Sequence, residues 1–331
     1  MLSRIMNGTR ERPTSLTDRS NAKLAALYEL VCGQHLDVAD YVLQSQHVID
    51  LLDILCHRIN LLDTTLTSTS SGGTTTQTCD IVVGALCRLL STIFDTLHGH
   101  YSTLTDSTDD SLAFNHIIQD VISYIVSVGM IDKLSLMMAN TRGPVDDNPE
   151  LTQCLRSVVS LFSSLSKLMA LRVEERFGAR LADDDTQLML TFGARLADDD
   201  TQLMLTFQMT HIGGVVSLIY GVLLHSGAPQ RADGDRPPAV ADHTLDLTLE
   251  VIRLLNYVSL LDLNVVQCVL GGEGLSLQLR HICSYLLWYC THHKREALLN
   301  EAILLVGNFV VLNDENQALL ESGQRPTAVQ Q

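Results

Sequence analysis

Aromatic residues and proline are scarce in this chain. Phe, Trp and Tyr make up 5% of its 331 residues and only 7 residues are proline, whereas 46% are hydrophobic. A β-sandwich or a β-barrel would require more aromatic and β-branched residues in alternation, so this composition favours helices over sheets. The apolar content is sufficient for a large continuous core.

Basic residues are also few. The chain has 22 Lys and Arg against 38 Asp and Glu, which gives a net charge of −16. Because so acidic a surface repels phosphate backbones, we expect no direct nucleic-acid binding by this segment. Protein partners that present basic grooves or basic tails fit this charge better.

Paired cysteine motifs and a secretory leader are missing. The 8 cysteines lie along expected helices without a CxxC pair, and residues 1–12 do not have the pattern of a signal peptide. We therefore expect reduced, buried cysteines and a cytosolic setting. The longest strongly apolar run, Ile212 to Leu224, is shorter than the roughly 20 residues of a bilayer span, so no transmembrane segment is expected.

The common catalytic and nucleotide-binding motifs do not occur. GxSxG, HExxH, GxxxxGK[ST] and GxGxxG are absent, and the GGEG at Gly271 to Gly274 follows an expected helix, where it indicates a helix stop. The sequence therefore predicts a protein that is not an enzyme and that carries no cofactor or metal.

The clearest pattern lies near the end of the chain. Apolar residues crowd Leu298 to Val311 too closely for a helix with one buried stripe, so we expect a helix that is buried on most of its circumference. Asn313 to Asn316 favour a turn and a helix N-cap, Gln317 to Leu320 begin a short helix, and Gly323 ends it. Pro326 can open another helix, so the chain is expected to stop inside one, as a fragment would.

This order of long helix, turn, short helix and glycine stop is typical of an armadillo repeat. The residues that match the armadillo motif are Ala302, Ile303, Val306, Gly307, Asn308 and Phe309. Gly307 is expected to let a neighbouring helix approach closely, since it has no side chain. Glycine costs up to about 1 kcal/mol of helix propensity, which that packing must offset.

The same pattern returns elsewhere in the sequence. Helix stops are expected at Gln46, Gly129 and Gly213. Their spacings of 83 and 84 residues are each close to two periods of about 42, and the later spacings are uneven. The run Leu254 to Tyr257 matches Val306 to Phe309. We therefore predict an all-α protein, a right-handed α-solenoid of armadillo-like or HEAT-like repeats with about six to eight helical pairs or triplets.

One solenoid domain is expected over residues 21–331, after a polar, disordered lead-in at residues 1–20. Long disordered insert loops are expected at residues 64–78, 98–111, 172–208 and 226–242. The third loop contains FGARLADDDTQLMLT twice without a change, at residues 177–191 and 192–206. Because the repeats of a folded solenoid diverge, this identity indicates a recent duplication or a gene-model artefact.

Three segments resemble a known family. Tyr124 to Leu151, Gly271 to Ile282 and Leu298 to Gln331 are similar to the carboxy-terminal helical region of the S phase cyclin A-associated proteins in the endoplasmic reticulum. The resemblance implies a non-enzymatic adaptor or scaffold in the cytoplasm, peripheral to the endoplasmic reticulum, with the nucleus as a further location.

The resemblance also implies the kinds of partner. The family is connected with cyclin A and with the recruitment of a deadenylase complex during tubulin messenger-RNA decay. Its coiled-coil and zinc-finger regions have no counterpart in this sequence, so a complex of cyclin A with its kinase would be bound by regions that this chain lacks. The deadenylase complex is the partner expected for the helical region.

Armadillo proteins use asparagines of the third helix to hydrogen-bond an extended peptide in a concave groove. The resemblance to armadillo repeats implies this role for Asn256 and Asn308, and for Ser91 at the matching place of an earlier repeat. The alternative is that these side chains cap or bridge adjacent repeats. Trp288 shares a helical face with Tyr285 and Tyr289, which indicates either core packing or an aromatic contact with a partner.

Two further functions remain open. The chain could bind a metal through His281, Cys283, Cys290 and His292, although their spacing matches no structural zinc pattern. It could also be a purely structural segment that orders a longer polypeptide.

Overall fold

The computed structural model describes residues 36–68, 81–102, 109–141, 145–181, 211–224 and 239–322, with residue 237 and a few residues between 25 and 32. The predicted lead-in at residues 1–20, residues 182–206 of the tandem repeat, Gly323 and Pro326 lie outside these ranges.

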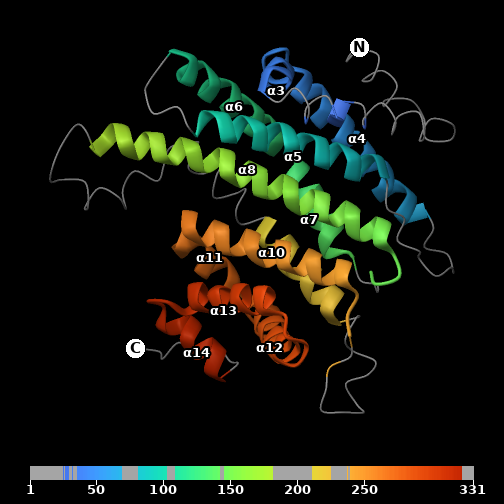
Figure 1. Ribbon diagram of the computed structural model, residues 1–331, viewed down its shortest axis with the longest axis vertical. Coiled ribbons are helices and arrows are strands. Elements are labelled where there is room, and N and C mark those ends of the chain that lie inside the picture. The colour runs from blue at the N-terminus through green and yellow to red at the C-terminus, as the bar shows by residue number, and fades with distance from the viewer. Residues whose placement is uncertain are drawn as a thin grey trace. The chain divides into compact units, whose positions relative to one another are not determined.

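Every regular element of the described residues is a helix, which confirms the all-α prediction (Figure 1). In chain order the helices are α3 (Leu36–Gln44), α4 (His47–Ser68), α5 (Ile81–Tyr101), α6 (Asp109–Ser127), α7 (Met130–Ala139), α8 (Pro149–Leu181), a helix at His211–Leu224, α10 (Asp242–Leu261), α11 (Leu263–Leu270), α12 (Leu275–His293), α13 (Glu296–Val310) and α14 (Asp314–Ser322). They form two compact units, residues 1–133 with 160–206, and residues 134–159 with 207–331.

In the first unit, α3, α4 and α5 pack against one another, and α6 packs on α4. Leu52, Leu86 and Phe94 are fully buried in this core. Two predicted stops are confirmed by the backbone, since Gln46 (φ 60°) separates α3 from α4 and Gly129 (φ 63°) separates α6 from α7. Left-handed backbone at these residues ends one helix and redirects the chain into the next.

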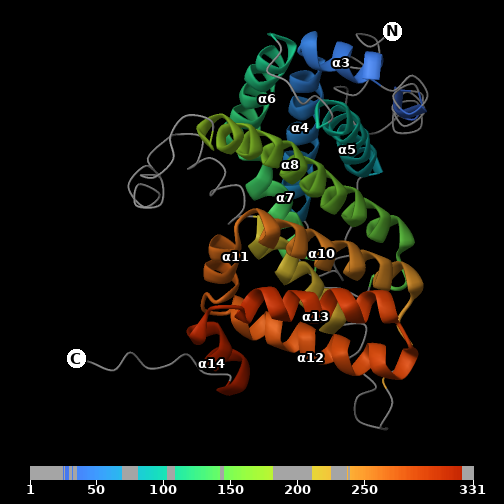
Figure 2. The same ribbon diagram turned by 60° about the vertical axis from the view of Figure 1, so that its left-hand side comes forward.

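In the second unit, α13 lies between α10 and α12 (Figure 2). The Asp262 side chain caps α11 by accepting a hydrogen bond from the Val265 amide, and Gly274 (φ 88°) precedes α12. Asn313 Oδ1 accepts a hydrogen bond from the Asn316 amide at 3.0 Å and so caps α14, as the sequence predicted. The predicted order of long and short helices is therefore present here.

Several predicted loops are shorter than expected. α4 continues to Ser68 and α8 to Leu181, and both extensions enter predicted loops. α5 continues to Tyr101 and α6 begins at Asp109, at the two ends of the predicted loop at residues 98–111. Because a helix that is already formed adds residues at little cost, polar residues alone do not end it.

The predicted stop at Gly213 is wrong. The helix His211–Leu224 passes through Gly213 and Gly214. A Cβ added to Gly214 would lie 2.7 Å from Ser135 Cβ and 2.8 Å from Ser135 Cα. Glycine at position 214 therefore allows α7 and this helix to approach closely, and it does not end the helix.

The expectation that α13 is buried on most of its circumference is also wrong. The structure buries Leu298, Ala302, Leu305 and Phe309 on one side. Ile303 is 53% exposed and Leu304 is 50% exposed. No Cβ contact would form at Gly307, where nothing lies within 4 Å. The outer side of α13 is thus not covered by a helix of the described residues.

The sequence was judged for membrane-spanning length only at Ile212–Leu224, but another helix passes the same test. By length and composition α5 is long and apolar enough to span a membrane, and the broken pair His116–Ser127 and Met130–Ala139 also passes when taken as one span. In the structure 61% of the apolar window of α5 is buried inside the protein. This burial fits a core helix of the first unit.

Gly214→Ala should lower the free energy of unfolding by about 1–3 kcal/mol, because the added methyl group meets the backbone of Ser135. The matched control is Gly307→Ala, also inside a helix, where the methyl group meets nothing within 4 Å. This control should raise the free energy of unfolding by up to about 1 kcal/mol through helix propensity. Urea unfolding followed by circular dichroism measures both, and equal effects would contradict the close approach at Gly214.

Candidate protein-interaction site

Asn256 joins α10 to α13 from a buried position, with 4% of the residue exposed. Its Nδ2 donates hydrogen bonds to the backbone oxygen of Glu301 at 3.0 Å and to Glu301 Oε2 at 2.8 Å. Its Oδ1 accepts a hydrogen bond from Asn308 Nδ2 at 3.2 Å. At the solvent edge, Arg253 Nε lies 3.2 Å from Glu301 Oε1. These contacts give Asn256 and Asn308 the bridging role that the sequence left open, while their binding of a partner stays a prediction.

A second group of amides ties α11 to the end of α13. Gln267 Nε2 donates to the backbone oxygen of Asn308 at 2.9 Å, and Gln267 Oε1 accepts from Asn313 Nδ2 at 3.2 Å. Asn316 Nδ2 donates to the backbone oxygens of Gln267 at 3.2 Å and Phe309 at 3.0 Å. The amides satisfy carbonyl groups that the end of a helix leaves without partners. Sequence reasoning missed this role of Gln267 and Asn316.

When α10 and α13 are aligned by their buried residues, the alignment differs by one residue from the alignment by the armadillo motif. The buried residues with the same spacing are Leu247, Val251, Leu254 and Val258 in α10, and Leu298, Ala302, Leu305 and Phe309 in α13. In this register Asn256 corresponds to Gly307 and Tyr257 corresponds to Asn308. The two asparagines therefore face each other across one helix contact.

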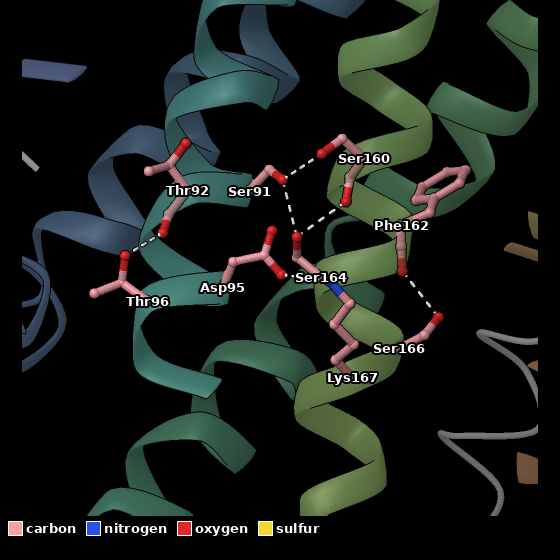
Figure 3. A network of polar contacts seen from close by, with 9 residues as sticks. All are labelled: Ser91, Thr92, Asp95, Thr96, Ser160, Phe162, Ser164, Ser166 and Lys167. Carbon is pink, nitrogen blue, oxygen red and sulfur yellow. Dashed lines mark hydrogen bonds and ion pairs between the residues drawn. The ribbon is translucent and has the colours of Figure 1, made fainter. Parts of the chain in front are cut away.

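Ser91 lies in a polar contact between α5 and α8 in the first unit (Figure 3). Its Oγ is 2.7 Å from Ser160 Oγ and 2.9 Å from Ser164 Oγ, and the residue is 3% exposed. Beside it, Lys167 Nζ lies 2.8 Å from Asp95 Oδ1. The hydroxyl of Ser91 is thus directed at α8, as in the bridging alternative, and its contact with a partner stays a prediction.

Trp288 is half-buried on α12. Its ring meets that of Tyr285 at a centroid distance of 6.2 Å and that of His292 at 5.8 Å, both in edge-on geometry. Tyr285 and Tyr289 are buried. Trp288 is therefore the member of this aromatic face that retains accessible surface, and its role in partner binding stays a prediction.

Comparison with known proteins gives one informative match. No family model matches the chain. The human S phase cyclin A-associated protein in the endoplasmic reticulum is 27% identical to it over 333 residues, which cover 96% of this chain and 22% of that protein. This chain is a relative of that protein. The resemblance predicted from the sequence is thereby confirmed.

The relative is a much longer protein. The chain spans 22% of its length, and the match extends into both units because it covers 96% of the chain. The name of the relative associates that protein with cyclin A and with the endoplasmic reticulum. It does not say which region of the relative makes either association.

The alternative metal site is not formed on α12. Cys283 and Cys290 are buried, whereas His281 and His292 are exposed. Across the described ranges, no group of three or more His, Cys, Asp and Glu side chains is arranged to hold a metal ion. Burial raises the pKa of Cys283 to about 12 and the pKa of Cys290 to about 11, which opposes the thiolate form that zinc requires.

The cysteines differ in exposure. Those that are buried, as expected, are Cys56, Cys87, Cys154, Cys283 and Cys290. The expectation is wrong for Cys32 and Cys268, which are exposed, and Cys79 lies outside the described residues. Cys268 follows the buried Gln267 on α11, so a single helix of eight residues places neighbouring side chains in opposite environments.

Asn256→Ala should lower the free energy of unfolding by about 1–3 kcal/mol, because it removes the part-buried hydrogen bonds of Asn256 to Asn308 and to two oxygens of Glu301. The control is Asn300→Ala, the same change at an exposed position of α13, which should alter stability by less than about 0.5 kcal/mol. Urea unfolding compares the two variants. Equal stability of both would mean that the Asn256 hydrogen bonds contribute nothing measurable.

A thiol-reactive maleimide should label Cys268 much faster than Cys283 in the folded chain at pH 8. Burial raises the pKa of Cys283 from 9.0 to about 12, which lowers its thiolate fraction roughly a thousandfold, and burial also blocks the reagent. Peptide mass spectrometry gives the rate at each cysteine. In urea the two rates should converge, and equal rates in the folded chain would contradict the burial of Cys283.

Proposed function

We propose that this chain is a non-enzymatic helical-repeat module, an adaptor or scaffold that binds other proteins. The carrying observation is that α10 and α13 bury residues at the same spacing and pack side by side. Such packing is expected when one helix of each repeat lies against its counterpart in the next. We accordingly propose an armadillo-like or HEAT-like right-handed α-solenoid as the arrangement of residues 21–331.

Repeat proteins bind partners along an extended surface, since each repeat contacts only its neighbours and leaves one side open. On α10 and α13 the open side carries Arg253, Leu260 and Leu304, with exposed fractions of 56% for the Arg253 side chain, 79% for Leu260 and 50% for Leu304. Asn308 borders this side and is half-buried. Asn256 and Asn308 would then act mainly by holding α13 against α10, which fixes the surface that a partner meets.

The similarity to the human relative supports the choice of partners. We propose a place in protein complexes associated with cyclin A, at the cytoplasmic periphery of the endoplasmic reticulum, with cyclin A and its kinase contacted by regions outside this chain. The proposal extends to the recruitment of a deadenylase complex during tubulin messenger-RNA decay. A net charge of −16 favours basic surfaces on these partners.

Immobilised chain incubated with cytoplasmic extract should recover subunits of a deadenylase complex, as measured by quantitative mass spectrometry. The double variant Asn256→Ala with Asn308→Ala should lower this recovery at least about fivefold, which corresponds to the loss of about 1 kcal/mol of binding free energy. Asn60→Ala, at an exposed position of α4 in the first unit, should leave the recovery unchanged.

Two results would contradict the proposal. If the unmodified chain recovers no deadenylase subunit, the chain is better described as a structural segment that orders a longer polypeptide. If the double variant recovers every subunit at full yield while it remains folded, the α10–α13 surface is not the binding surface.

A further inference from the structure

One side of α13 is only partly covered by the described residues. In the register set by burial, α10 has a second buried face whose residues are Thr248, Ile252, Leu255, Asn256 and Ser259. The corresponding residues of α13 are Leu299, Ile303, Val306, Gly307 and Val310, which we call the outer face. Ile252 is 1% exposed, whereas its counterpart Ile303 is 53% exposed.

The second face of α10 is the one that meets α13. Asn256 belongs to it and hydrogen-bonds Glu301 of α13. The outer face of α13 therefore corresponds to a surface that, on α10, a neighbouring helix covers. On the opposite side of α13, Glu301 and Asn308 face α10, so the outer face is open to a helix that approaches from the side away from α10.

A small apolar pocket adjoins the outer face. It is lined by Leu279 and Cys283 of α12, by Val306 and Phe309 of α13 and by Leu319 and Leu320 of α14. Ser276 and Arg280 complete its lining. Val306 belongs both to the pocket and to the outer face, so the pocket lies beside that face, between helices that lie together in Figure 2.

The charge around this surface selects the kind of helix that fits. Residues 296–322 contain no Lys or Arg. Their carboxylates are Glu296, Glu301, Asp314, Glu315 and Glu321. Two copies of this chain that met through the outer face would bring these like charges together, which opposes self-association. A helix with basic residues beside its apolar stripe meets opposite charge instead, because the exposed Glu296, Asp314, Glu315 and Glu321 outnumber Arg280, the one cation in the adjoining lining.

We propose that the outer face of α13 binds an amphipathic helix of a partner protein, which packs on α13 as α13 packs on α10. The apolar stripe of that helix covers Ile303 and Val306, and its Lys or Arg side chains lie toward the exposed carboxylates of α13 and α14 other than Glu301, which faces α10. The inference rests on the proposed function and names the class of partner for one surface of the module.

The test uses the whole chain and a synthetic helix of about fifteen residues, with Leu at a spacing of three and four and Lys at the other positions. Fluorescence anisotropy should show saturable binding of this Leu–Lys peptide. A Leu–Glu peptide of the same pattern should bind at least about tenfold more weakly.

Ile303→Glu should weaken binding of the Leu–Lys peptide by about tenfold or more, because a carboxylate replaces apolar surface in the contact. This variant is more acidic than the unmodified chain, so non-specific attraction of the cationic peptide would change the affinity in the opposite direction. Ile303→Gln, which adds no charge, should weaken binding about fivefold. The control Leu136→Glu carries the same charge on α7, at a residue that is 54% exposed, and should not weaken binding.

Other occupants of the outer face give different results. Equal binding to the unmodified chain and to Ile303→Glu, or no binding at all, overturns the proposal. A dimer in analytical ultracentrifugation that Ile303→Glu dissociates assigns the surface to a second copy. A marked gain in peptide affinity on removal of residues 323–331 assigns it to the tail of this chain.

The peptide-binding experiment and the recovery of deadenylase subunits can fail independently of each other. If the Leu–Lys peptide does not bind while the chain recovers deadenylase subunits, the inference fails and the proposed function stands. If the peptide binds and no subunit is recovered, the outer face is a helix-binding surface and the choice of partner is wrong.

Discussion

The organisation of the second unit depends on the contact between α10 and α13, in which apolar packing is combined with one buried amide. Apolar contact is not directional, so two helices lined with Leu, Val and Ile can slide along each other at little cost. Asn256 prevents this, because a shift of one residue would separate its amide from Glu301 and Asn308. An unsatisfied buried amide costs about 1–3 kcal/mol, which is enough to fix one register.

In the first unit, smaller polar side chains fix the position of one helix against another. Where α5 meets α8, Ser91, Ser160 and Ser164 combine short side chains, which let the helices approach, with hydroxyls that bond to one another. The Asp95–Lys167 pair at the half-exposed edge adds at most about 1 kcal/mol. Helices of either unit are therefore positioned by a few polar groups within a larger apolar contact.

Much of the helical order was predictable because the signals are local. Left-handed residues such as Gln46 and Gly129, and caps such as Asn313, act within one turn of the chain. The register of α10 against α13 was not predictable by motif, because Asn256 and Asn308 are alike in type but occupy different positions in the packing. The prediction of a helix stop at Gly213 was wrong because the adjacent Gly214 is required by close packing on Ser135. That residue is distant in sequence, so no local pattern reveals the contact.

Gly307 shows how the exposed side of α13 bears on function. Glycine inside a helix costs up to about 1 kcal/mol relative to alanine, and the sequence suggested that close packing offsets this cost. In the described residues nothing lies within 4 Å of the position that a Cβ would occupy, so no such packing is present. The same helix leaves Ile303 and Leu304 half exposed, which adds the cost of apolar surface in water. A second helix against this side would cover the flanking apolar groups, and the close approach that a residue without a side chain permits would offset the helix-propensity cost of Gly307.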